Sequence, residues 1–169
     1  MLRLLVLIAL CASCAPIAQR ATAAPGALAR VEASLDADGK PVGHDGARAT
    51  VVVVFASWCE HCHHELATLA DLRASHPGMR ILGVNYKAHE EYNRWGSSEA
   101  VRAYVSEHAP WLRVVPCDDA LFDALGRPAM VPTLYVYDAG GTLVAAYDRR
   151  ERPQPERAEL DELLRRLGA

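Results

Sequence analysis

Hydrophobic and polar positions are grouped along the chain in blocks that predict strands and helices in turn. The uninterrupted apolar run at residues 51–55 is typical of a strand buried on both faces, and residues 81–86 predict a second buried strand. Between them, apolar residues recur every three or four positions from Cys62, which predicts an amphipathic helix that begins near Cys59 and ends near Ser75. The first part of the chain therefore predicts a β-α-β unit.

The rest of the chain continues this alternation. The predicted strands are residues 112–115, 134–137 and 142–147, and the predicted helices are one capped by Ser97 or Ser98, one at residues 119–125 and one over Leu160, Leu163, Leu164 and Leu167. Residues 31–35 and 41–42, around a turn at 36–39, predict a short N-terminal hairpin. The order β-α-β-α-β, followed by a hairpin and a helix, predicts an α/β three-layer α/β/α sandwich with a central mixed sheet.

Two cysteines one helical turn apart, Cys59 and Cys62, are the candidate chemistry. Cys59 is predicted at a helix N-terminus, where free amide groups and the helix dipole stabilise an anion, so its thiolate should be favoured as the nucleophile. Cys62, further along on the buried stripe, would be the resolving thiol. We therefore expect a redox-active disulfide, Cys59–Cys62, that opens and closes without a cofactor or a metal.

Other uses of the same residues stay open at this point. With His63, the two cysteines match C-x-x-C-H, the attachment motif of c-type haem. His61, His63 and His64 could hold zinc or copper with the cysteines, although four ligands within six helical residues cannot converge on one tetrahedral centre. A structural disulfide is the third alternative.

Composition limits the class of protein. The chain has 169 residues, 51% of them hydrophobic, which suits one globular core. Its formal net charge is −3 and it has no basic cluster, so a nucleic acid partner is not expected.

The N-terminus has the layout of an export signal. Arg3 is followed by the apolar residues 4–12, and Ala21-Thr22-Ala23 supplies a small-residue cleavage pattern. We expect a signal peptide over residues 1–23 and a single domain over 24–169. Lipidation at Cys14 or retention of the segment as a membrane anchor are variants, and all three place the domain in the periplasm or otherwise outside the cytoplasm. Cleavage would leave Cys117 without a partner, most simply as a small half-buried hydrophobe.

Four sequence features carry a resemblance to a known family. They are the F-x-x-W-C-x-x-C pattern at residues 55–62, the acid Glu65 three positions later, Val131-Pro132-Thr133, and Gly83-Val84-Asn85-Tyr86-Lys87. Across nearly all of the mature chain, the sequence resembles the exported TlpA/ResA/DsbE(CcmG)-like branch of the thioredoxin-fold proteins.

The resemblance implies roles for individual residues. Pro132 would be cis, face the cysteines and expose the backbone of Val131 to a substrate peptide. Glu65 would take a proton from the Cys62 thiol or hold its pKa high. Trp58 would lie beside the dithiol and shield it from water.

The dipeptide between the cysteines, Glu60-His61, departs from the proline-containing form of many family members. Protonated His61 would stabilise the Cys59 thiolate and make the pair more oxidising, while Glu60 would oppose this. The direction of electron flow therefore stays open at this point.

The resemblance also implies a function. We expect a thiol-disulfide oxidoreductase that reduces specific protein disulfides, such as those of apocytochrome c, and receives electrons from a membrane dithiol protein. An oxidant or isomerase of exported proteins is the alternative within this class. Tyr92 and Trp95, among charged residues in the segment 87–98, either dock a partner or pin the loop to the surface.

Overall fold

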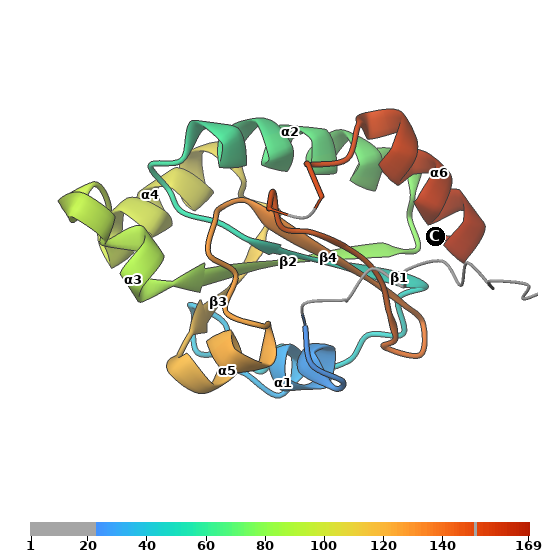
Figure 1. Cartoon of the computed structure of the whole chain (residues 1–169), viewed down its shortest axis with the longest axis horizontal. Helices are drawn as coiled ribbons and strands as arrows, with labels where there is room; N and C mark the ends of the chain where they lie inside the picture. Colours follow the sequence, from blue (N-terminus) through green and yellow to red (C-terminus); the bar gives the residue numbers. More distant parts are fainter. Residues whose placement is uncertain (1–22, 151) are drawn as a thin grey trace, which may run out of the picture.

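A five-stranded mixed sheet forms the middle of the molecule (Figure 1), in a computed structural model that describes residues 23–150 and 152–169. The strand order is β3-β2-β1-β4-β5. The strands are β1 (Ala49–Val54), β2 (Met79–Tyr86), β3 (Arg113–Cys117), β4 (Thr133–Asp138) and β5 (Leu143–Tyr147).

The directions of the strands follow from their connections. β1, β2 and β3 are parallel because helices carry the chain back over the sheet between them. β4 runs antiparallel to β1, with Val54 paired to Thr133, and a short turn joins β4 to the antiparallel β5. This pairing places the start of β4 beside the end of β1, where the thiol-bearing helix begins.

Helices cover both faces of the sheet (Figure 1), with α2, α4 and α6 on one face and α1 and α5 on the other. The helices are α1 (Ala27–Glu32), α2 (Glu60–Ser75), α3 (Lys87–Glu90), α4 (Ser98–His108), α5 (Asp119–Ala124) and α6 (Arg157–Leu167), with a 3₁₀ turn, η1 (Tyr92–Arg94). The predicted three-layer α/β/α sandwich with a mixed sheet is confirmed.

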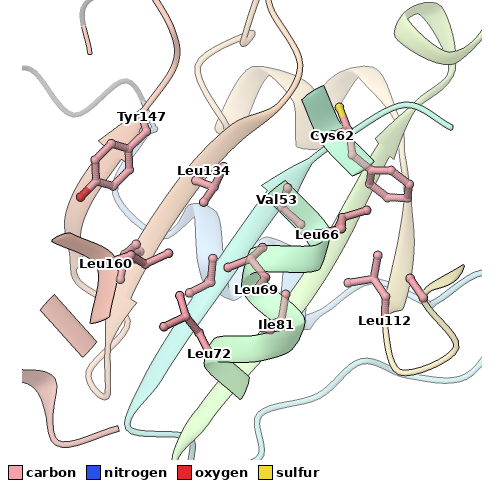
Figure 2. Packing of buried hydrophobic residues seen from close by; sticks show 14 of the residues in the cluster. Val53, Cys62, Leu66, Leu69, Leu72, Ile81, Leu112, Leu134, Tyr147 and Leu160 are labelled. Carbon is pink, nitrogen blue, oxygen red and sulfur yellow. The ribbon is translucent and has the colours of Figure 1, made fainter. Parts of the chain in front are cut away.

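One hydrophobic core lies on each side of the sheet. Figure 2 shows the core under α2, where Leu66, Leu69 and Leu72 pack between the strands and α6. These three leucines and Cys62 are at most 2% exposed, so the apolar stripe predicted for this helix is confirmed. Valines of β1 contribute to both cores, as expected for a central strand buried on both faces.

The predicted N-terminal hairpin is wrong in its first strand. Residues 27–32 form α1 instead, because Ala27, Leu28 and Val31 at helical spacing bury against the sheet beside α5. Of the hairpin only the turn remains, closed by a single antiparallel bridge between Leu35 and Pro41.

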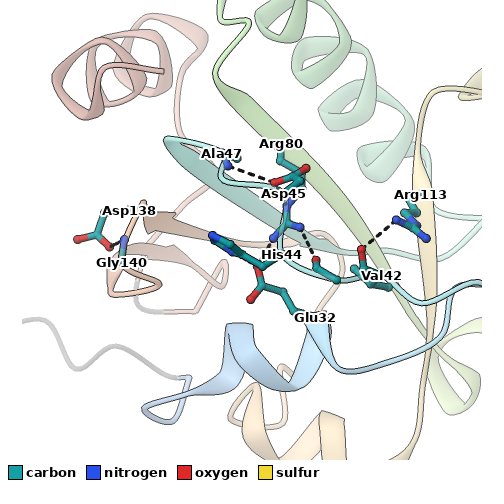
Figure 3. A network of polar contacts seen from close by, with 10 residues as sticks. Glu32, Val42, His44, Asp45, Ala47, Arg80, Arg113, Asp138 and Gly140 are labelled. Carbon is teal, nitrogen blue, oxygen red and sulfur yellow. Dashed lines mark hydrogen bonds and ion pairs between the residues drawn. The ribbon is translucent and has the colours of Figure 1, made fainter.

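Polar contacts hold the segment after α1 against the edge of the sheet (Figure 3). The guanidinium of Arg80 on β2 pairs with Glu32 and donates to the carbonyl oxygen of Gly43 over 2.7 Å. Arg113 on β3 donates to the carbonyl oxygen of Val42 over 3.0 Å (Figure 3). It also donates to Asp36 over 2.8 Å. Side chains of β2 and β3 thus hold this turn in place, and no hairpin strand is needed for it.

Within the described residues, none of the helices combines the length and the apolar character needed to cross a bilayer. The predicted signal peptide, with its lipidation and anchor variants, lies outside the described residues apart from Ala23.

Candidate active site

Cys59 is the N-cap of α2, as its position after an apolar strand predicts. Its backbone is extended, with φ −88° and ψ 105°, and its sulfur accepts a hydrogen bond from the Cys62 amide over 3.2 Å. The hydrogen bond from the Cys62 side chain lowers the pKa of Cys59 to about 7. A large fraction of this thiol is therefore ionised, and nucleophilic, at neutral pH.

Cys62 lies one turn further into α2 and is fully buried. Burial raises the pKa of Cys62 far above that of an ordinary thiol, and the hydrogen bond to Cys59 raises it further. The structure contains both residues as free thiols. The two thiols therefore differ in acidity, with the pKa of Cys59 lowered and that of Cys62 raised.

Glu65 follows Cys62 by three residues on the same helix and is only 8% exposed. Its Oε1 atom is buried without a hydrogen-bond partner, and burial raises the pKa of the Glu65 carboxyl to about 7. A carboxyl group with this pKa can both accept and release a proton near neutral pH.

The Val131–Pro132 peptide bond is cis, as the resemblance implied. The thiol of Cys59 donates to the carbonyl oxygen of Val131 over 3.7 Å, so the loop before β4 lies against the nucleophile. Two residues that sequence reasoning missed hold this loop. Arg149 donates to the carbonyl oxygen of Val131 over 3.3 Å, and Gln154 donates to that of Pro132 over 3.0 Å.

The loop before Cys59 is held by a buried carboxylate that sequence reasoning also missed. Glu90, 1% exposed, accepts from the Ser57 amide over 2.8 Å and from the side-chain amide of Asn85 over 2.9 Å. The indole of Trp58 donates to the backbone oxygen of Glu90 over 2.9 Å. Asn85 belongs to the motif noted in the sequence, but the charged run around Glu90 gave no sign of burial.

The histidines around the cysteines point in different directions. His63 donates through Nε2 to the carbonyl oxygen of Ser57 over 2.7 Å, and its ring stacks on Tyr104 at 4.4 Å. His61 is exposed beside Glu60 at the rim of the groove that contains Cys59. In the part of the chain that the structure describes, no three side chains of the metal-binding types are grouped as ligands.

Cys117 lies at the end of β3, away from the other thiols and in the core beneath the opposite face of the sheet. It is 7% exposed, and burial raises the pKa of its thiol to about 12. Cys117 thus lies in the core as a small hydrophobe, and it is more deeply buried than the half-buried position that the sequence predicts.

Comparisons with known proteins place this arrangement among solved structures. No family model matches the chain, and neither does any curated protein sequence. Similar structures include a secreted Mycobacterium tuberculosis disulfide oxidoreductase homologous to E. coli DsbE, at 18% identity and a TM-score of 0.62, covering 79% of this chain and 93% of that one.

Two further structures agree with the first. A thiol:disulfide interchange protein of the thioredoxin family from Chlorobium tepidum matches at 20% identity and a TM-score of 0.63, covering 80% and 92% of the two chains. StoA from Bacillus subtilis matches at 16% identity and a TM-score of 0.58, covering 76% and 92%. Together with the dithiol at the start of α2 and the cis-proline loop facing it, these likenesses show that the chain has the thioredoxin-like fold.

Proposed function

We propose that the protein is a thiol-disulfide oxidoreductase in which Cys59 attacks and Cys62 resolves. The observation that carries the proposal is the pairing of an N-cap thiol, whose pKa is lowered to about 7, with a fully buried thiol one turn away, whose pKa is raised. A structural pair of cysteines has no need for two such different environments.

The reaction is a two-electron exchange. The Cys59 thiolate attacks one sulfur of a client disulfide, so a mixed disulfide forms and the other client sulfur leaves as a thiolate that takes up a proton. Cys62 then loses its proton and attacks the sulfur of Cys59, which releases the second client thiolate. The client is reduced to a dithiol, and the protein is oxidised to the Cys59–Cys62 disulfide.

Glu65 is the proton acceptor for the second step. Glu65 follows Cys62 by three residues on α2, and its pKa of about 7 leaves part of the population ionised at neutral pH. An ionised Glu65 can take the Cys62 proton as Cys62 attacks, and the same carboxyl can return it when the disulfide is reduced again.

The client backbone is expected to pair with Val131. Its carbonyl oxygen lies 3.7 Å from the Cys59 sulfur, so a peptide bound along this loop would bring its own cysteine to the nucleophile. Trp58, from the loop before Cys59, lines the groove that contains Cys59 and Val131.

We infer export and a reducing role from the resemblance and from the predicted signal peptide. In this proposal the domain lies in the periplasm or is otherwise exported, the clients are proteins with disulfides such as apocytochrome c, and a membrane dithiol protein re-reduces the Cys59–Cys62 disulfide. One similar structure is described as secreted and homologous to DsbE, which supports this choice.

Trapping tests the mechanism. Cys62→Ser should accumulate a mixed disulfide between Cys59 and a client, because the resolving thiol is gone, and Cys59→Ser should trap nothing. Cys117→Ser is the matched control and should behave as the wild type. Absence of any adduct with Cys62→Ser, or stoichiometric haem or metal on the purified protein, would contradict the proposal.

The second candidate is a disulfide oxidant. The lowered pKa of Cys59 favours it, because a stabilised thiolate stabilises the reduced form and makes the pair more oxidising. Equilibration with glutathione separates the two: a reduction potential near −270 mV, like that of thioredoxin, supports the reductant, and one near −120 mV, like that of DsbA, supports the oxidant.

A further inference from the structure

Most of the large exposed apolar side chains line the groove that contains Cys59. Among residues 23–150 and 152–169, five such side chains are exposed: Leu35, Tyr92, Trp95, Met130 and Val144. Three of the five, Tyr92, Trp95 and Met130, line the same groove, together with Cys59 itself. Such a gathering next to a reactive thiol is typical of a binding surface rather than of scattered surface residues.

This groove, which we call the aromatic groove, has a volume of about 640 Å³. Trp58, Tyr92 and Trp95 line it with rings in mutual contact, which we call the aromatic wall, and Met130 and Val131 of the loop before β4 line it as well. The same groove thus contains Cys59, the aromatic wall and the backbone to which a client is expected to pair.

The aromatic wall is fixed by buried contacts. The carboxylate of Glu90 accepts from Ser57 and Asn85, and its backbone oxygen accepts from the indole of Trp58. Gly96 packs against the same residue so closely that a Cβ there would lie 2.0 Å from Glu90 Oε1. The contacts of Glu90 fix the position of this segment. Tyr92 and Trp95 are therefore exposed in a segment that buried polar contacts hold in place.

The aromatic rings of the groove contact one another and still have exposed surface. The Trp58 and Trp95 rings meet edge to face, with centroids 4.9 Å apart and planes at 72°. Tyr92 meets Trp95 in the same way, at 5.4 Å and 81°. Tyr92 is still 55% exposed and Trp95 58%, so both can receive a further ring and gain from burial.

We propose that the aromatic groove binds an apolar side chain, preferably an aromatic ring, that lies next to the cysteine of the client peptide. This inference rests on the proposed function and names its substrate class: protein disulfides whose cysteine has an aromatic neighbour in sequence. The groove would then select clients before the covalent step, while Val131 pairs with any backbone.

A set of matched peptides tests the selection. Each carries one cysteine as a mixed disulfide with glutathione and differs only in the neighbouring residue, which is Phe, Leu or Ser. The wild type should reduce the Phe peptide with a kcat/KM roughly tenfold above that for the Ser peptide, with Leu between them, as is usual for one apolar contact.

Substitutions locate the effect. Trp95→Ser should reduce the Phe-to-Ser ratio of kcat/KM to near 1, and Tyr92→Ser should reduce it in part. Val144→Ser removes an exposed apolar side chain elsewhere and should keep the wild-type ratio. Equal rates for the Phe and Ser peptides in the wild type, or an unchanged ratio in Trp95→Ser, would overturn the proposal while leaving disulfide exchange intact.

Binding gives a readout that needs no exchange. A Phe peptide with alanine in place of cysteine should shift the indole N–H resonances of Trp58 and Trp95 in NMR spectra and leave that of Trp111, which is outside the groove, in place. No shift, or an equal shift of all three resonances, would overturn the proposed binding in the groove. This result can be read even if the protein shows no disulfide exchange. The same two resonances moving with protein concentration alone would assign the groove to a second copy of the chain and overturn the client proposal.

Discussion

The two thiols differ in pKa because of where each residue stands on the same helix. Cys59 precedes the first helical residue, and its sulfur accepts a hydrogen bond from the Cys62 amide, which also donates to the Cys59 carbonyl oxygen over 2.9 Å. Cys62 faces the core, where a charge has no solvent. A separation of one helical turn therefore gives the two thiols different pKa values.

Alkylation as a function of pH should report this difference. The rate at which iodoacetamide modifies Cys59 should rise with pH and reach half its plateau near pH 7, because only the thiolate reacts. Cys62 and Cys117 should stay protonated in the folded protein and react only after denaturation, because burial raises the pKa of both thiols. Mass-spectrometric counting of modified cysteines measures all three, and rapid labelling of native Cys117 at neutral pH would contradict its raised pKa.

Glu65 should make stability depend on pH. Its pKa is about 7 in the folded chain and 4.5 in the reference state, so the folded state holds the proton more tightly. The resulting stabilisation is complete below pH 4.5 and is lost as pH rises through 7. Glu65→Gln should remove this dependence, so that the variant gains on the wild type between pH 4.5 and 7 in urea unfolding. Parallel curves would show that Glu65 is not buried as described.

At the scale of elements, the predicted parts are those with a local signal. The valine-rich β1, the stripe on α2 and the serine cap of α4 each depend on neighbours within a few residues, and all three appear as predicted. The first hairpin strand failed because its apolar spacing also suits a short helix, and packing beside α5 decides for α1.

The candidate site also contains residues that a local sequence signal predicts and residues that it does not. Cys59, Cys62 and Pro132 lie in short motifs, so the sequence indicates them directly. Glu90 does not, because it acts on Ser57 from 33 positions away and its charge suggests a solvated loop. Such a partner is found only once the ends of β1 and β2 lie side by side.

The segment after α3 should tolerate little change at Gly96. An added Cβ would lie 2.0 Å from the Glu90 carboxylate and 2.8 Å from its backbone oxygen, so Gly96→Ala should lower the free energy of unfolding by about 1–3 kcal/mol. Gly140→Ala, at an exposed turn where the nearest atom lies 3.4 Å away, is the matched control and should change little. Equal unfolding midpoints for the two variants would contradict the close packing at Gly96.

At the scale of the whole molecule, α6 closes the core that supports the active-site helix. Leu160 and Leu164 are fully buried against it, and His76 at the end of α2 pairs with Asp161 over 2.9 Å. The His76–Asp161 pair thus joins α6 to the C-terminal end of α2, while the thiols are at its N-terminal end.

Truncation of a side chain in this contact should lower the stability of the whole domain. Leu160→Ala should lower the free energy of unfolding by about 2–5 kcal/mol, because it leaves a cavity in the core. Leu163→Ala, on a half-buried position of the same helix, should cost distinctly less. Guanidinium unfolding measures both, and similar losses would show that α6 does not close the core.

The distance along the chain between Cys59 and Val131, 72 residues, has a consequence for the newborn protein. Translation at about 5–20 residues per second separates their appearance by roughly 4–14 s. During that interval no loop covers the two thiols, and β1, which precedes their helix, has no β4 beside it. A chain in the course of synthesis is therefore open to stray oxidation, and a reducing environment at the ribosome would protect it until the last third has emerged.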